Sequence, residues 1–213
     1  MDSIDDIMIM ILRKLSMRDC MIFLVTYKKF KSYYNGKFAF TDAISYKHIS
    51  YGSLVYFKYI NYISNVANIS DTKFCLPPNT KKIMFGYSFN KNIYKYIPNT
   101  IMHITFGQMF DQSINNCIPN SVLYLKFGVN FNQPINNCIP NSVLYLKFGY
   151  CFNQLINGYI PDSVIYLKFG ICFNQHISIL PVSVSKIVFG YLYKQNLDHI
   201  PKTTTISYKK LIF

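Results

Sequence analysis

The chain has 213 residues, of which 51% are hydrophobic and 17% aromatic, so it is long and apolar enough to bury a core. Its longest apolar stretch, residues 7–12, is far shorter than the roughly 20 residues of a transmembrane helix, and its acidic start differs from a secretory signal. The formal net charge of +13 is compatible with nucleic acid, a membrane surface or acidic proteins as partners, but the composition of an AT-rich coding sequence accounts for the larger share of it. We therefore expect a soluble, cytoplasmic protein without a membrane partner.

Residues 1–35 show the pattern of two short helices. Apolar residues recur at helical spacing from Ile4 to Leu15, which is typical of one amphipathic helix. Ser3 and Ser16 each begin a capping pattern that an Asp completes three residues later. The segment is therefore interpreted as a small helical module.

Residues 36–75 carry the weakest pattern in the chain. A helix beginning after Ser53 and a degenerate strand over 73–76 are both compatible with the letters. We treat 36–75 as a segment that connects the helical module to the rest of the chain.

From residue 76 onward the chain repeats itself. The letters INNCIPNSVLYLKFG of Ile114–Gly128 return unchanged in Ile135–Gly149, and a Gly and a Pro recur every 21 residues, shortening to 20 near the end. The units begin at residues 76, 97, 118, 139, 160 and 180, and a partial seventh begins at residue 200. We assign 76–213 to one repeat domain.

Each unit contains one short strand followed by a turn. Apolar and polar residues alternate before the Gly, which predicts a strand with one buried face and places Phe127, Phe148 and Phe169 in the core. The Gly ends the strand, where a positive φ would favour it, and an Ile-Pro pair turns the chain into the next unit. Because one unit cannot bury its apolar face alone, the units stack into a solenoid with a parallel sheet.

The repeat resembles a known family. The pattern FGxxFNQxIxxxIPxSVxxLxFG, clearest in residues 127–133 and 139–140, is similar to the FNIP repeat of social amoebae and giant viruses, a relative of leucine-rich repeats. The resemblance implies a curved right-handed solenoid with its sheet on the concave face. It also implies a structural ladder in which one recurring Asn hydrogen-bonds the backbone of neighbouring turns. The ladder residues are Asn90, Asn132, Asn153 and Asn174.

The N-terminal module resembles an F-box. Residues 4–30 follow the spacing of that family without a gap, although Asp5 replaces the usual Pro and Phe30 the usual Trp. The resemblance implies docking to a Skp-type adaptor of a cullin–RING ubiquitin ligase, through Ile4, Ile7, Ile11, Leu15, Met17 and Phe30. Together the two resemblances imply an α+β chain, with a short helical F-box-like module ahead of a leucine-rich-repeat-like solenoid. The alternative is that the two helices only cap the first coil.

Two columns of equivalent residues mark the solvent side of the predicted sheet. In three successive units a Tyr stands four residues before the Gly and a Lys stands two before it. Tyr is favoured at interfaces and Lys is positive, so the columns predict a docking surface for an acidic or Tyr-compatible target segment. Recent duplication of one unit explains the same columns without a function. The candidate target-binding residues are Tyr124, Tyr145, Tyr166, Lys126, Lys147 and Lys168.

No pattern in the sequence predicts catalysis. The four His lack a Ser, Cys or Asp partner at a recognisable spacing, the six Cys form no CxxC pair, and no phosphate-binding loop is present. We expect no cofactor and no metal, and nucleic acid binding is disfavoured because only the charge supports it. The predicted function is a non-enzymatic, substrate-recruiting subunit of an SCF-type ubiquitin ligase. The alternative is an interaction module consisting of the repeats alone.

Overall fold

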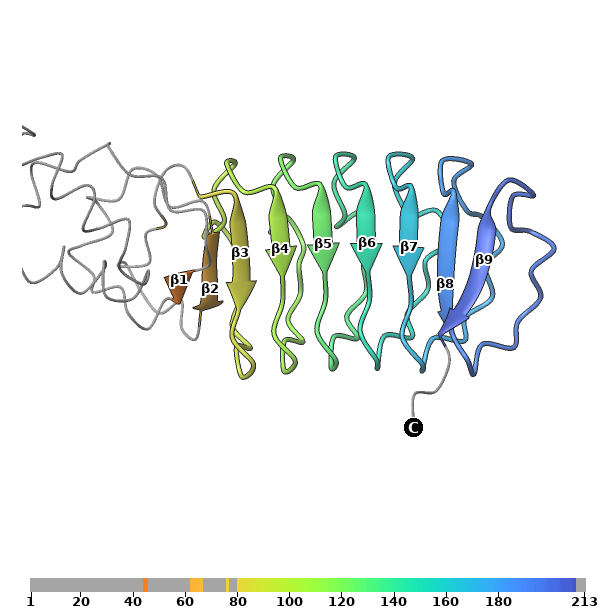
Figure 1. The fold of residues 1–213 in the computed structure, drawn as a ribbon, viewed down its shortest axis with the longest axis horizontal. Helices are drawn as coiled ribbons and strands as arrows, with labels where there is room; N and C mark the ends of the chain where they lie inside the picture. The colour runs from red at the N-terminus through yellow and green to blue at the C-terminus, as the bar shows by residue number, and fades with distance from the viewer. Residues whose placement is uncertain (1–43, 46–61, 67–75, 77–79, 210–213) are drawn as a thin grey trace, which may run out of the picture.

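The computed structural model describes residues 44–45, 62–66, 76 and 80–209, and these form a solenoid with one strand in each coil (Figure 1). The strands cross a single sheet in chain order, and every neighbouring pair is parallel. This parallel β-solenoid is the architecture that the repeat predicts. The strands are β1 (Ile44–Ser45), β2 (Tyr62–Val66), β3 (Lys82–Phe85), β4 (His103–Thr105), β5 (Tyr124–Lys126), β6 (Tyr145–Lys147), β7 (Tyr166–Lys168), β8 (Lys186–Gly190) and β9 (Thr205–Lys209).

The described residues contain no helix, so the helical half of the α+β prediction finds no support among them. The two helices expected in residues 1–35 and the helix expected after Ser53 lie outside the described residues. Among the described residues there is accordingly no helix that is long and apolar enough to span a membrane.

The sheet begins earlier in the chain than the repeat letters do. Strands β1 and β2 lie within the segment that was expected only to connect the module to the repeats, and β2 pairs with β3 through Tyr62↔Lys82 and Ile63↔Ile83. Residues 36–75 contain neither the Phe-Gly nor the Ile-Pro pair of the repeat. Strand pairing depends on backbone hydrogen bonds, which any side chain except Pro allows, so the sheet continues where the letters do not.

The core consists of stacked rows of equivalent side chains. The inward position of each repeat strand is filled by an Ile or Leu, and Leu125, Leu146 and Leu167 are completely buried. The predicted burial of Phe127, Phe148 and Phe169 is confirmed, since their exposed fractions are 2%, 5% and 1%. Neighbouring rings in this row are nearly parallel, with centroids 5.5 Å apart for both pairs.

A second aromatic row packs directly against the first. It comes from the turn after each Gly, and Phe152 in this row stacks on Phe148 with ring centroids 3.8 Å apart. The same contact recurs in the neighbouring coils, between Phe127 and Phe131 at 3.9 Å and between Phe169 and Phe173 at 3.8 Å. Two rows of rings therefore run through the core from coil to coil, beside the aliphatic rows.

The recurring Gly is required for close approach of neighbouring coils, which corrects the expectation of a positive φ. A Cβ built on Gly149 would lie 1.6 Å from the carbonyl oxygen of Gly128, and one on Gly128 would lie 1.7 Å from that of Gly107. Among the described residues the only Gly with positive φ is Gly158, which lies in a turn outside this row. The stacking distance therefore excludes every side chain at these positions.

The predicted Asn ladder is present. Asn132 Oδ1 accepts hydrogen bonds from the backbone N–H of Asn153 at 2.8 Å and from Nε2 of Gln154 at 3.1 Å. Asp111 takes the same place in its own coil, where Oδ1 accepts from Asn132 N and from Gln133 Nε2. An Asp fits the ladder because only an acceptor oxygen is needed.

A row of hydroxyl groups, which the repeat letters did not lead us to predict, joins the coils at a second place. Ser142 Oγ donates to the carbonyl of Val122 at 2.7 Å, and Ser163 Oγ donates to the carbonyl of Val143 at 2.8 Å. Side-chain hydrogen bonds thus tie each coil to the one before it on both sides of the strand.

Candidate functional site

The six residues predicted to bind a target lie side by side on the outward face of the sheet. Register pairs Tyr124 with Tyr145 and Tyr145 with Tyr166, and it pairs the three lysines in the same way. We call these two sets the Tyr column (Tyr124, Tyr145, Tyr166) and the Lys column (Lys126, Lys147, Lys168). Lys126 and Tyr145 are exposed, whereas the other four are half-buried by their neighbours.

The Tyr column is held in place by Lys147. The Nζ atom of Lys147 donates a hydrogen bond to Tyr124 Oη at 3.2 Å and lies 4.8 Å from the centroid of that ring. The same Nζ lies 5.2 Å from the ring centroid of Tyr166, so one ammonium group contacts the rings on both sides of Tyr145. The Lys column is therefore not uniform, because its middle member is engaged with the tyrosines.

Lys126 and Lys168 line a groove at the carboxyl ends of the strands, the arrowhead end of β5–β7 in Figure 1. We call it the glycine groove. It encloses about 410 Å³, and Gly128, Gly149 and Gly170 lie among its lining residues. In each of these coils the Gly separates a Lys two positions before it from an apolar residue directly after it. The side chains that give the groove its chemistry are Lys126, Lys168, Lys209, Val129, Tyr150 and Ile171.

The glycine groove is positive. Burial lowers the pKa of Lys168, and repulsion from Lys209, Lys147 and Lys126 lowers it further. Within the described part of the chain, every charged group that acts on the pKa of Lys168 is thus another lysine. Such a cluster of ammonium groups repels itself in the free protein and favours a negatively charged ligand.

Lys168→Met should raise the melting temperature at pH 7. The pKa of Lys168 is lower in the folded chain than its usual 10.5, so protonated Lys168 opposes folding below that folded pKa. The opposition fades as the pH rises through the folded pKa toward 10.5, where the amine loses its proton in the unfolded chain as well. Met keeps the apolar stem and removes the charge.

The measurement is thermal unfolding at pH 7 and pH 10, followed by circular dichroism. Lys186→Met is the matched control, because Lys186 is an exposed lysine on the next strand and lies outside the glycine groove. We expect the gain from Lys168→Met to exceed that of the control at pH 7 and to shrink at pH 10. An equal gain at both pH values would exclude charge repulsion as its cause.

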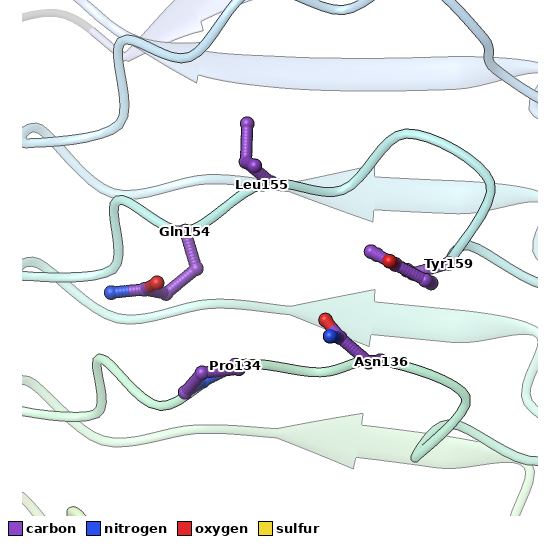
Figure 2. A pocket seen from close by; sticks show the side chains of 5 residues that line it. All are labelled: Pro134, Asn136, Gln154, Leu155 and Tyr159. Atoms are coloured by element: carbon purple, nitrogen blue, oxygen red, sulfur yellow. The ribbon is translucent and has the colours of Figure 1, made fainter.

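A second, smaller pocket lies on the segments that return from one strand to the next (Figure 2). It encloses about 190 Å³ between two successive coils and is lined by Pro134, Asn136, Gln154, Leu155 and Tyr159. Gln154 lines this pocket, but its side-chain amide already donates a hydrogen bond to Asn132 in the Asn ladder. Ligand pockets usually enclose about 300–1,000 Å³, so the glycine groove is the better candidate site.

Sequence reasoning did not identify Lys209 or the apolar residues beside the glycines. Lys209 belongs to the last, partial unit, and register places it opposite Gly190 rather than in the Lys column. The available signal was the Gly row itself, because Gly128, Gly149 and Gly170 lie among the lining residues of the groove. The six predicted adaptor-binding residues, from Ile4 to Phe30, lie outside the described residues.

Comparison with known proteins identifies the repeat. The FNIP repeat family matches residues 72–109, 110–151 and 131–172, so the chain contains FNIP repeats. No curated protein matches the chain. A similar solved structure is that of CroV588, described as a novel circular LRR protein structure, with a TM-score of 0.52 and 34% sequence identity. That match covers 68% of this chain and 25% of the CroV588 chain, so the matched part spans about a quarter of that protein. The chain is thus a leucine-rich-repeat-like solenoid, an architecture suited to protein–protein interaction.

Proposed function

We propose that this protein is a substrate-recruiting subunit of an SCF-type cullin–RING ubiquitin ligase. The single observation that carries the ligase assignment is the F-box-like spacing of residues 4–30 on the N-terminal side of the FNIP repeats. In this proposal the N-terminal module docks a Skp-type adaptor and the solenoid holds the target. The protein performs no chemistry itself and works in the cytoplasm, the host's cytoplasm if the chain is viral.

The surface of the solenoid supports the recruiting half of this function. Lysines and tyrosines gather on one face of the sheet, and a groove large enough for a bound segment runs beside them. Because equivalent strands of successive coils lie side by side, their outward residues form one continuous surface. A target can therefore lie across several coils at once.

The alternative function is a non-enzymatic interaction solenoid in which the N-terminal helices only cap the first coil. The capping role has a clear physical basis, because the open end of a solenoid exposes core side chains. Both functions need the same solenoid, and adaptor binding distinguishes them.

The test is co-purification of a Skp-type adaptor with the intact chain and with two variants. Leu15→Asp combined with Phe30→Asp should abolish adaptor binding, because both positions belong to the predicted contact. Lys126→Ser combined with Lys168→Ser should leave it intact, since both lysines line the glycine groove. If the adaptor fails to co-purify with the intact chain, the ligase function is wrong and the capping alternative stands.

A further inference from the structure

The glycine groove has two chemically different walls. Positive charge on one wall comes from Lys126, Lys168 and Lys209. Lys126 ends β5 and Lys168 ends β7, and each precedes the Gly of its own coil by two residues. Val129 and Ile171 follow the same glycines directly and are half-buried. A ligand lying over the glycines therefore has ammonium groups on one side and apolar side chains on the other.

The floor of the groove is set by the packing of the coils. Gly128, Gly149 and Gly170 cannot carry a side chain, because a Cβ on any of them would lie within 1.9 Å of the preceding glycine's carbonyl oxygen. Gly149 and Gly170 are partly exposed, so a ligand can approach the backbone closely at these two coils, whereas Gly128 is buried. Neighbouring parallel strands are about 4.8 Å apart, and an extended peptide rises about 3.3 Å per residue. A peptide that lies across the strands therefore needs about four residues to cross the three coils.

We propose that the glycine groove binds an extended acidic segment of a partner protein in which acidic and apolar residues alternate. Successive side chains of an extended segment point to opposite sides. Over these three coils the acidic residues then face Lys126 at one end and the neighbouring Lys168 and Lys209 at the other, and the apolar residues face the side formed by Val129, Tyr150 and Ile171. This inference deepens the proposed function, on which it rests only in assuming that the solenoid holds a protein.

The charge of the groove matches such a segment. The pKa of Lys168 is lowered by burial and by three neighbouring lysines, so a bound carboxylate relieves repulsion that the free protein carries. Tyr150, which is 49% exposed, adds a large side chain that can cover an apolar residue of the ligand. Carboxylates and apolar groups thus each find a matching wall.

The neighbouring tyrosines argue against a nucleic acid in the same place. Single-stranded nucleic acids bind by stacking their bases on free aromatic faces beside a positive groove. Here neighbouring rings of the Tyr column are tilted by 34° and 37°, and Lys147 Nζ lies over the rings of Tyr124 and Tyr166. The column therefore offers no row of parallel, uncovered faces for successive bases.

The test measures the anisotropy of a fluorescent peptide on the full chain at low and physiological ionic strength. The probe is the alternating peptide DVDIDVD, and the comparison peptide DDDDVIV has the same composition in blocks. Lys126→Ser combined with Lys168→Ser should weaken binding of DVDIDVD about tenfold. The double change removes two ion pairs between a lysine and a peptide carboxylate, and each such pair near the surface contributes modestly. The matched control is Lys82→Ser combined with Lys186→Ser, which removes two exposed lysines of the same sheet outside the groove and should change binding less than about twofold.

A further variant tests the apolar wall separately from the charge. The wild-type chain should prefer DVDIDVD to DDDDVIV, and Ile171→Ser should reduce that preference. The inference is overturned if neither peptide binds, if both lysine pairs weaken binding equally, or if the chain has no preference for alternation. Tighter, groove-dependent binding of oligothymidine would overturn it in favour of nucleic acid. Because the peptide assay needs no adaptor, a chain that binds DVDIDVD but not the adaptor contradicts the ligase function alone.

Discussion

Gly149→Ala should destabilise the solenoid by about 4 kcal/mol or more, the range reserved for severe steric or core defects. The new Cβ would lie 1.6 Å from the carbonyl oxygen of Gly128 and 2.5 Å from its carbonyl carbon. Both atoms belong to the backbone of the preceding coil, so no rotation of a flexible side chain can relieve the overlap. The two coils must separate, which breaks strand pairing and opens the aromatic core between them. Urea unfolding followed by circular dichroism measures the loss.

Gly158→Ala is the matched control for this prediction. A Cβ at Gly158 meets no atom within 4 Å, but the residue has a φ of +76°. The cost there is backbone strain alone, about 1–2 kcal/mol. If Gly158→Ala and Gly149→Ala cost the same, close approach between coils is not the reason for the Gly row.

Phe148→Ala should cost about 3–5 kcal/mol of folding free energy. The ring is 5% exposed, it stacks at 5.5 Å on the rings of Phe127 and Phe169, and it lies 3.8 Å from the ring centroid of Phe152. Its removal leaves a cavity that rigid neighbouring coils cannot close, because backbone hydrogen bonds set their spacing. Thermal and urea unfolding of the variant both report this loss.

Tyr145→Ala removes an aromatic ring from the same coil at the outward position of β6. Tyr145 is 41% exposed, so its loss should cost less than about 1 kcal/mol. Equal losses for Phe148→Ala and Tyr145→Ala would mean that the outward face, rather than the core, stabilises the coil. That result would contradict the burial that distinguishes the two faces.

The sequence by itself determined the structure of the repeat unit. A spacing of 21 residues, alternation before each Gly and Ile-Pro turns predict one strand per coil, an inward row of Phe, and parallel stacking. These features are encoded locally, because side-chain alternation and turn residues act within a few positions of the chain. The Asn ladder was expected from the resemblance to the FNIP repeat, and the hydrogen bonds between coils confirm it.

Only the tertiary structure decided how the surface is divided. Three lysines with identical neighbours in sequence were predicted to act alike, yet Lys147 engages Tyr124 and Tyr166 while Lys126 and Lys168 line the glycine groove. A long flexible side chain takes its direction from neighbours in other coils, which alternation along one strand does not specify. The Gly row likewise takes its meaning from the distance between coils and not from its own φ. Backbone pairing also places coils of unlike sequence side by side. It brings Lys209 to the glycine groove, and it extends the sheet by β1 and β2, neither of which the repeat letters show.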